Sequence, residues 1–163
     1  MEITKEIQLD YGHIVHMHTS ACKNPHGHRA RIIAHLKGDL INDEVSENGM
    51  VMDFKHIKQI MMNRIHSVLD HSFIIWNGAK QVPFLEEMNE NCYNGTMRLV
   101  LLNNAPTAEN LAKWCFDQML QDIKDIYGTG LRLCAVEFWE TPSSCAVYTP
   151  DIIPLTDTDV KLK

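Results

Sequence analysis

Two stretches of alternating polar and apolar residues flank a histidine-rich segment in residues 3–40, which have the sequence ITKEIQLDYGHIVHMHTSACKNPHGHRARIIAHLKGDL. Residues 3–11 alternate in the manner of a half-buried strand, and residues 29–40 do so again. We therefore expect two antiparallel strands joined by a loop that holds the histidines.

Five of the nine histidines fall within residues 13–28, and three of them are suited to bind a metal. His26 and His28 enter the second strand two residues apart, so their side chains should project from the same face. His13 ends the first strand, which the hairpin would bring alongside the second. Three neutral imidazoles leave a tetrahedral zinc one open position, as in catalytic zinc sites. The alternative is a loop of surface histidines without a metal.

Other residues of the loop have less certain roles. His16 and His18 could compete for the metal, but they lie inside the loop without fixed strand geometry, so we expect them not to be ligands. Cys22 lies four residues before His26, and a cation nearby would favour its thiolate, which makes it a candidate acid/base group. For the other four cysteines we expect a packing role.

Two further positions carry carboxylates suited to chemistry. Asp70 and His71 are adjacent, and a carboxylate beside an imidazole can form a proton relay. The alternative is a histidine recruited to a helix C-terminus by the helix dipole. Glu140 ends an apolar alternating segment, where a carboxylate can accept two parallel N–H bonds from a guanidine-like edge. The alternative for Glu140 is a solvated strand end.

The rest of the chain predicts two helices and more strands. A helix should begin after Asp53, where apolar residues recur at helical spacing, and a second should begin at Thr107 and end before Gly128. Residues 97–103 (MRLVLLN) predict a short strand, and alternation on both sides of residues 141–144 (TPSS) predicts a hairpin. The order strand, strand, helix, helix, strand, strand indicates an α+β fold.

Length and composition indicate one soluble domain. We expect residues 1–163 to form a single domain whose residues 151–163 are a surface extension. The net charge of −6 without a basic block argues against nucleic acid, and no apolar run approaches the roughly 20 residues that cross a bilayer. Five widely spaced cysteines without a CxxC pair fit reduced thiols, and we expect a cytoplasmic protein.

The segments GHxV, CKNPHGH, GMVMDF, LDH, PTAENLAKW and ET, in this order, resemble the 6-pyruvoyltetrahydropterin synthase family over about residues 5–148. This resemblance implies the tunnelling fold, ββααββ, an antiparallel sheet with two helices on one face. In that family the sheets of several subunits join into a trimeric barrel, and two trimers stack as a hexamer, so a homo-oligomer is expected.

The resemblance also implies roles for individual residues. The zinc ligands would be His13, His26 and His28; the catalytic residues would be Cys22, Asp70 and His71; and Glu140 would anchor the pterin substrate. The spacing Cys-x-x-x-His-Gly-His is similar to the bacterial 6-carboxytetrahydropterin synthase branch. That branch converts 7,8-dihydroneopterin triphosphate to 6-carboxy-5,6,7,8-tetrahydropterin, with release of acetaldehyde and triphosphate, toward queuosine and other 7-deazaguanines. The alternatives are the pyruvoyl reaction and a non-catalytic zinc-stabilised oligomeric binding module in which Cys22 is the fourth ligand.

Two features depart from the compact members of the family. Residues 71–102 are longer than expected, which predicts an added strand or lid. His16 and His18 replace residues that are not expected to be histidine. Both features lie close to the predicted pocket, so they bear on substrate choice.

Overall fold

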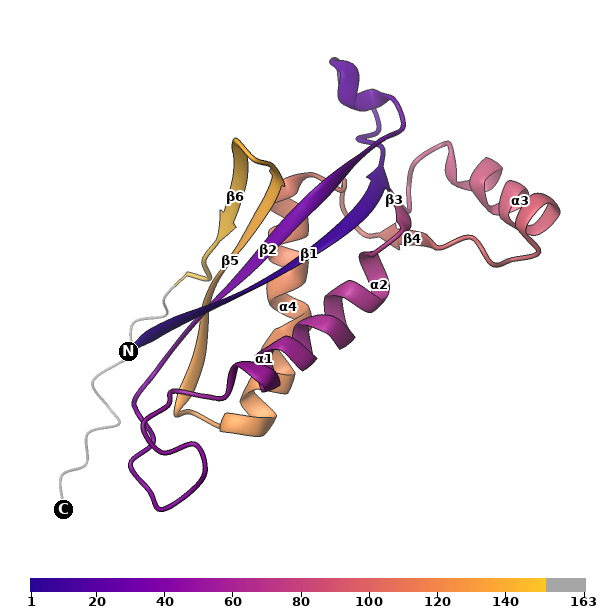
Figure 1. Ribbon diagram of the computed structural model, residues 1–163. Helices are drawn as coiled ribbons and strands as arrows, with labels where there is room; N and C mark the ends of the chain where they lie inside the picture. Colours follow the sequence, from indigo (N-terminus) through magenta and orange to yellow (C-terminus); the bar gives the residue numbers. More distant parts are fainter. Residues whose placement is uncertain (152–163) are drawn as a thin grey trace.

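Residues 1–151 of the computed structural model form a mixed six-stranded sheet in the order β4-β3-β1-β2-β5-β6 (Figure 1). The predicted surface extension lies almost entirely outside these described residues. The strands are β1 (Glu2–His13), β2 (His26–Gly38), β3 (Ser72–Trp76), β4 (Leu99–Leu102), β5 (Leu131–Thr141) and β6 (Ser144–Tyr148). The four strands expected from alternation, β1, β2, β5 and β6, are consecutive in the sheet and antiparallel, which confirms the predicted fold class.

The hairpin of β1 and β2 is the longest paired element of the sheet. Its register runs without interruption from Glu2↔Lys37 to His13↔His26. The side chains of Ile7, Leu9 and Tyr11 are buried on one face, while the residues between them are less buried. The sequence predicted this alternation, but β2 begins three residues earlier than expected, so the histidine pair belongs to the strand itself.

Two helical segments cover the apolar face of the sheet (Figure 1). The first comprises α1 (Phe54–Met61), a π-helical turn (Met62–His66) and α2 (Ser67–Leu69). The second is α4 (Ala108–Tyr127). Both begin at the expected caps, because the Asp53 carboxylate accepts from the Lys55 N–H and the Thr107 hydroxyl accepts from the Asn110 N–H.

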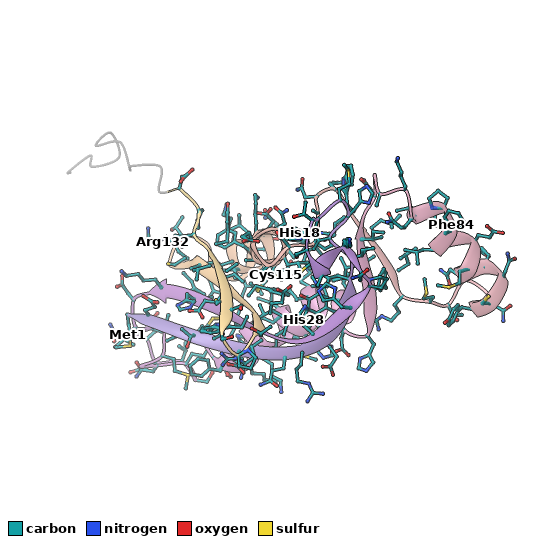
Figure 2. All side chains as sticks on the ribbon, turned by 90° about the horizontal axis from the view of Figure 1, so that it is seen from above. Met1, His18, His28, Phe84, Cys115 and Arg132 are labelled. Atoms are coloured by element: carbon teal, nitrogen blue, oxygen red, sulfur yellow. The ribbon has the colours of Figure 1, made fainter. Side chains whose placement is uncertain are left out.

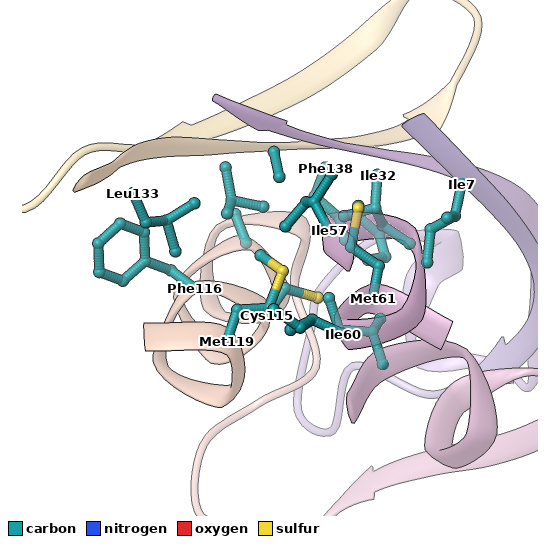
Figure 3. Close-up of a cluster of buried hydrophobic side chains, with 14 of the residues drawn as sticks. Ile7, Ile32, Ile57, Ile60, Met61, Cys115, Phe116, Met119, Leu133 and Phe138 are labelled. Atoms are coloured by element: carbon teal, nitrogen blue, oxygen red, sulfur yellow. The ribbon is translucent and has the colours of Figure 1, made fainter. Parts of the chain in front are cut away.

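The main core lies between these helices and the sheet (Figure 3). Ile57 and Met61 of α1 and Met119 of α4 are fully buried in the same cluster as Phe138 of β5. Burying each such side chain contributes roughly 1.5–3 kcal/mol. The core therefore fixes the sheet and helices as one unit, and the site described below lies where the two long central strands emerge from it.

Residues 71–102, which we call the insertion, contain β3, α3 (Val82–Tyr93) and β4, so the strand expected in residues 97–103 is present as β4. Strand β3 pairs in parallel with β1, and β4 pairs in parallel with β3, so the sheet is mixed at this edge rather than antiparallel throughout. Figure 1 shows α3 projecting away from the two-helix layer. A second, smaller apolar cluster holds the insertion together: Ile14, Ile75, Ala79 and Val82.

No helix within residues 1–151 is long and apolar enough to cross a membrane. This finding agrees with the absence of a long apolar run in the sequence.

The face of the sheet opposite the helices carries a charged network centred on His35. Its Nε2 lies 2.7 Å from a Glu137 carboxylate oxygen, and its Nδ1 lies 3.0 Å from a Glu2 carboxylate oxygen. Burial alone would lower the pKa of His35, but the hydrogen bonds to Glu2 and Glu137 outweigh burial and raise that pKa above its usual value. The imidazolium form therefore stabilises the folded protein.

We predict that His35→Gln destabilises the metal-free protein at acidic but not at alkaline pH. Because the folded-state pKa is raised, the stabilisation is complete below the unfolded value of about 6.5 and is lost as pH rises through the folded-state pKa. Urea unfolding of both proteins from about pH 5.5 to 9 would measure the difference in unfolding free energy. A difference that does not change with pH would show that His35 is uncharged in the folded state.

Candidate metal centre and active site

The three predicted metal ligands converge at one end of the central hairpin. The register places His13 opposite His26 and Tyr11 opposite His28, and all of these side chains lie on the helix-covered face. One ring nitrogen from each of His13, His26 and His28 lies within 4.8 Å of the other two. The two-residue spacing of the histidine pair and the antiparallel register are together sufficient to produce this cluster.

Backbone carbonyls set the tautomers of two of these rings. His13 Nδ1 lies 2.8 Å from the Pro106 carbonyl oxygen, and His26 Nδ1 lies 2.8 Å from the Asn24 carbonyl oxygen. A carbonyl can only accept, so each Nδ1 carries the proton, and each neutral ring presents the lone pair of its Nε2 to the cluster. Hydrogen bonds from the outer ring nitrogen to a carbonyl oxygen orient histidines at metal sites.

A cation between the inward-facing nitrogens would relieve the repulsion between their lone pairs and give each nitrogen a partner. His13 Nε2 and His26 Nε2 are 3.0 Å apart, and two lone pairs at that distance repel unless a proton or a metal ion lies between them. His28 Nε2 is buried and has no hydrogen-bond partner among the described residues. Three imidazole nitrogens are a donor set that zinc prefers, so the residues present fit this metal.

A glycine between the two strand histidines permits the close approach of β1 and β2. A Cβ atom at Gly27 would lie 2.7 Å from the Tyr11 carbonyl oxygen, which is too close for any side chain. The clashing atom belongs to the backbone of the paired strand, so a side chain here would force the two strands apart. The glycine of the His-Gly-His segment is therefore required by the packing that brings the rings together.

Burial favours the neutral form of His13, which is the form that binds a metal. The His13 side chain is almost completely enclosed. Burial lowers the pKa of His13, and the opposing effect of its bond to Pro106 does not compensate. The ring therefore remains neutral at physiological pH, as metal binding requires.

Glu140 lies beside the imidazoles at the end of β5. Its Oε1 is 3.5 Å from His13 Nε2 and 3.7 Å from His28 Nε2, and it accepts a hydrogen bond from the Tyr11 hydroxyl at 3.2 Å. Burial and the nearby Glu140 carboxylate raise the pKa of Tyr11, so its hydroxyl remains a donor. Glu140 is thus at the mouth of the sheet, as predicted, but directly beside the proposed metal position.

Cys22 faces the same cavity as His13 and Glu140. It lies in a short 3-10 turn (Ala21–Lys23) of the β1–β2 loop and is half-buried. The cavity has a volume of about 330 Å³ and includes, along its wall, His13, His18, Cys22, Glu109, Glu140 and Cys145. This volume is at the lower end of the range for small-molecule sites. The structure therefore brings together the imidazole cluster, a thiol and a carboxylate around one cavity.

The sequence did not single out Glu109 or Cys145, and it left His18 without a role. Glu109 lines the cavity because α4 begins there, and the predicted cap at Thr107 was a signal of its position. Cys145 reaches the cavity through the β5–β6 hairpin, which no local pattern indicates. His18 lines the cavity outside the imidazole cluster, and His16 packs beside Trp76, so neither joins the other three rings in the described part of the chain.

Asp70 and His71 form the predicted pair but lie away from this cavity. His71 Nδ1 is 2.8 Å from the Asp70 carboxylate, whose other oxygen accepts from the Asp10 N–H. Burial alone would raise the pKa of Asp70, but these hydrogen bonds outweigh it and lower that pKa. The His71 side chain is 74% exposed and its backbone has φ 54°. The Asp70 carboxylate is therefore ionised, and it holds an imidazole that is open to solvent beside β1.

The fold and the site define a class of protein: an α+β protein in which three histidines of a central hairpin form a cluster that could hold a metal beside an open cavity. Comparison with known proteins agrees. Residues 2–151 match the 6-pyruvoyl tetrahydropterin synthase family. The chain belongs to this family, whose enzymes act on pterins, and its histidine cluster is consistent with the metal site typical of the family.

Relatives and solved structures show the same similarity. The chain is 27% identical over 151 residues to 6-carboxy-5,6,7,8-tetrahydropterin synthase of Haemophilus influenzae, covering 90% of this chain and 97% of that protein. It is 34% identical over 128 residues to the enzyme of the same name from Aquifex aeolicus, covering 78% and 75%. An uncharacterized protein of Wolinella succinogenes has a TM-score of 0.77 at 26% identity, covering 93% and 98%. A variant of 6-pyruvoyltetrahydropterin synthase from Plasmodium vivax has a TM-score of 0.69 at 20% identity, covering 93% and 98%, and shows the fold alone.

Proposed function

We propose that this chain is a cytoplasmic, zinc-dependent 6-carboxy-5,6,7,8-tetrahydropterin synthase that converts 7,8-dihydroneopterin triphosphate and releases acetaldehyde and triphosphate. The observation that carries the proposal is the convergence of His13, His26 and His28 beside a cavity that Cys22 also lines. The relatives that are named for the carboxy product, and the Cys-x-x-x-His-Gly-His spacing, support this product over the pyruvoyl one.

Zinc held by the three histidines would act as a Lewis acid that acidifies the side-chain hydroxyls of the substrate. Cys22, on the wall of the same cavity, would then accept a proton from the polarised side chain during the internal redox step and the carbon–carbon cleavage. Glu140 would accept two N–H bonds from the pyrimidine edge of the pterin, and the Tyr11 hydroxyl would hold that carboxylate in place.

The Asp70–His71 pair would complete the proton transfer in a homo-oligomer. Within one chain, His71 is directed to solvent at the edge of β1 and does not line the cavity. A relay role therefore requires that His71 of one copy reach the cavity of a neighbouring copy. The trimer or dimer of trimers implied by the resemblance would supply such a neighbour.

The test is incubation of the zinc-loaded protein with 7,8-dihydroneopterin triphosphate, followed by assays for acetaldehyde and triphosphate. We expect both products in equal amounts, and no product after the metal is removed with a chelator. Triphosphate without acetaldehyde would identify the pyruvoyl reaction instead. Absence of turnover in a protein that holds zinc would favour the non-catalytic binding module.

A further inference from the structure

The loop between the two groups of zinc ligands is an ordered unit that carries Cys22. Its base is closed by a hydrogen bond from the Val15 N–H to the Cys22 carbonyl, 3.0 Å long. Within it, the His18 N–H donates to the Val15 carbonyl at 3.2 Å, and the Ser20 N–H donates to His18 Nδ1 at 3.0 Å. Because these bonds link the start of the loop to Cys22, whatever fixes the first residues of the loop also fixes the thiol.

The first residue of the loop is held by the insertion of residues 71–102. Strand β1 pairs with β3 as far as His13↔Ile74, so Ile14 leaves the sheet beside Ile75. Ile14 is only 4% exposed and packs in the smaller apolar cluster with Ile75 and Val82. Ile75 points to the opposite face from Ile74, because successive strand side chains alternate. The insertion therefore holds the loop from the side of the sheet that the main core does not occupy.

Trp76 makes the second contact between the insertion and the loop. Its ring lies 6.0 Å from the ring of His16, at an interplanar angle of 35°. The place of the indole is set by Gly78, where a Cβ atom would lie 2.4 Å from the tip of the indole ring. A glycine at this position leaves the space that the indole occupies. The indole in turn supports the loop at His16, two residues after Ile14.

We infer that the insertion positions Cys22, and that Trp76 is a positioning residue which acts through His16 and the closed loop. This inference rests on the proposed function in one respect, that Cys22 is the group whose placement affects turnover. The coupling between insertion and loop is a property of this chain's own packing and can be measured without substrate. It also gives the added strands and helix a role at the site, although α3 itself does not line the cavity.

The experiment compares Trp76→Ala with Phe84→Ala in the zinc-loaded protein. Phe84 is an aromatic residue of the same insertion, but it is 75% exposed and lies on the outside of α3 (Figure 2). We expect Trp76→Ala to speed amide hydrogen exchange at Val15 and His18 at least about tenfold, and to lower kcat roughly 10- to 100-fold with zinc retained. We expect Trp76→Phe to restore most of both properties, and Phe84→Ala to change neither.

Unchanged exchange at Val15 and His18 in Trp76→Ala would overturn the inference, as would an equal effect of Phe84→Ala. If Trp76→Ala fails to fold, Gly78→Ala provides the same test, because its methyl group displaces the indole without removing it. Failure of the proposed function has a different signature, namely no turnover in the wild-type protein. The exchange data would still decide whether the insertion fixes the loop.

Discussion

His28→Ala is expected to lose tightly bound zinc and nearly all turnover while its metal-free form remains folded. Removal of one of three imidazoles leaves two protein ligands, and we expect zinc affinity to fall roughly a thousandfold or more. Turnover should fall by a similar factor, because loss of a Lewis acid removes several kcal/mol of transition-state stabilisation. Metal analysis after dialysis and the acetaldehyde assay would measure the two effects.

The stability of the same variant provides an independent check on the site. His28 Nε2 is buried without a hydrogen-bond partner in the described structure, so the metal-free wild-type protein carries an unsatisfied polar atom that the variant lacks. We therefore expect metal-free His28→Ala to melt no lower than metal-free wild type, and only the wild type to gain stability when zinc is added. A variant that still gains stability from zinc would contradict the three-histidine site.

His18→Ala is the matched comparison for zinc content, because His18 was a rival ligand and lines the same cavity as His13. Its Nδ1 already accepts hydrogen bonds from the Ser20 N–H and hydroxyl groups, and it lies outside the imidazole cluster. We expect this variant to retain zinc. Loss of zinc in His18→Ala would show that the loop supplies a ligand.

The parts of the fold that the sequence predicted are those set by local spacing. Alternation in residues 3–11 and 29–40 predicted the hairpin, and the caps at Asp53 and Thr107 predicted where the two long helical segments begin. The imidazole cluster follows from the same two-residue period, because antiparallel pairing of two alternating strands aligns their buried faces.

The insertion could not be predicted in detail because its apolar residues pack into two separate apolar clusters. Ile74 and Ile75 are both fully buried, since β3 has apolar neighbours on both faces, so the alternation expected of a half-buried strand is missing. Helix α3 buries only Val82, and it therefore has no apolar stripe from which a helix could be recognised. The parallel pairing with β1 joins residues about 60 positions apart, which no local pattern specifies.

The arrangement of the site also depends on the pairing of strands that lie far apart in the sequence. The β2–β5 register pairs Arg31 with Trp139, which brings the next residue, Glu140, level with the imidazoles. The sequence placed this carboxylate at a strand end but could not place it beside the ligands. Likewise, the Asp70–His71 pair was predicted as a pair, but its position outside the cavity follows from its attachment to the backbone of Asp10.

Cys22→Ala is expected to lower turnover by at least about a hundredfold while the protein keeps its zinc and its fold. The thiol lines the cavity that contains His13 and Glu140, but it is not part of the cluster of ligand atoms within residues 1–151. Removal of a general acid/base group costs roughly 10²- to 10⁴-fold in rate. Zinc content, thermal melting and acetaldehyde release would be measured on the same preparation. Cys92→Ala is the matched control, because Cys92 is an exposed thiol on α3.

The competing interpretation makes Cys22 the fourth ligand of a closed structural zinc site, and the same variant separates the two. A closed site would lose zinc affinity and stability together with the thiol, since structural zinc contributes directly to folding. An open site would lose neither, because its three imidazoles remain and a solvent or substrate atom occupies the fourth position. Cobalt substitution gives the second measurement. An intense thiolate-to-cobalt charge-transfer band in the wild-type protein would place sulfur on the metal and contradict an acid/base role for Cys22, whereas a spectrum that Cys22→Ala leaves unchanged would support that role.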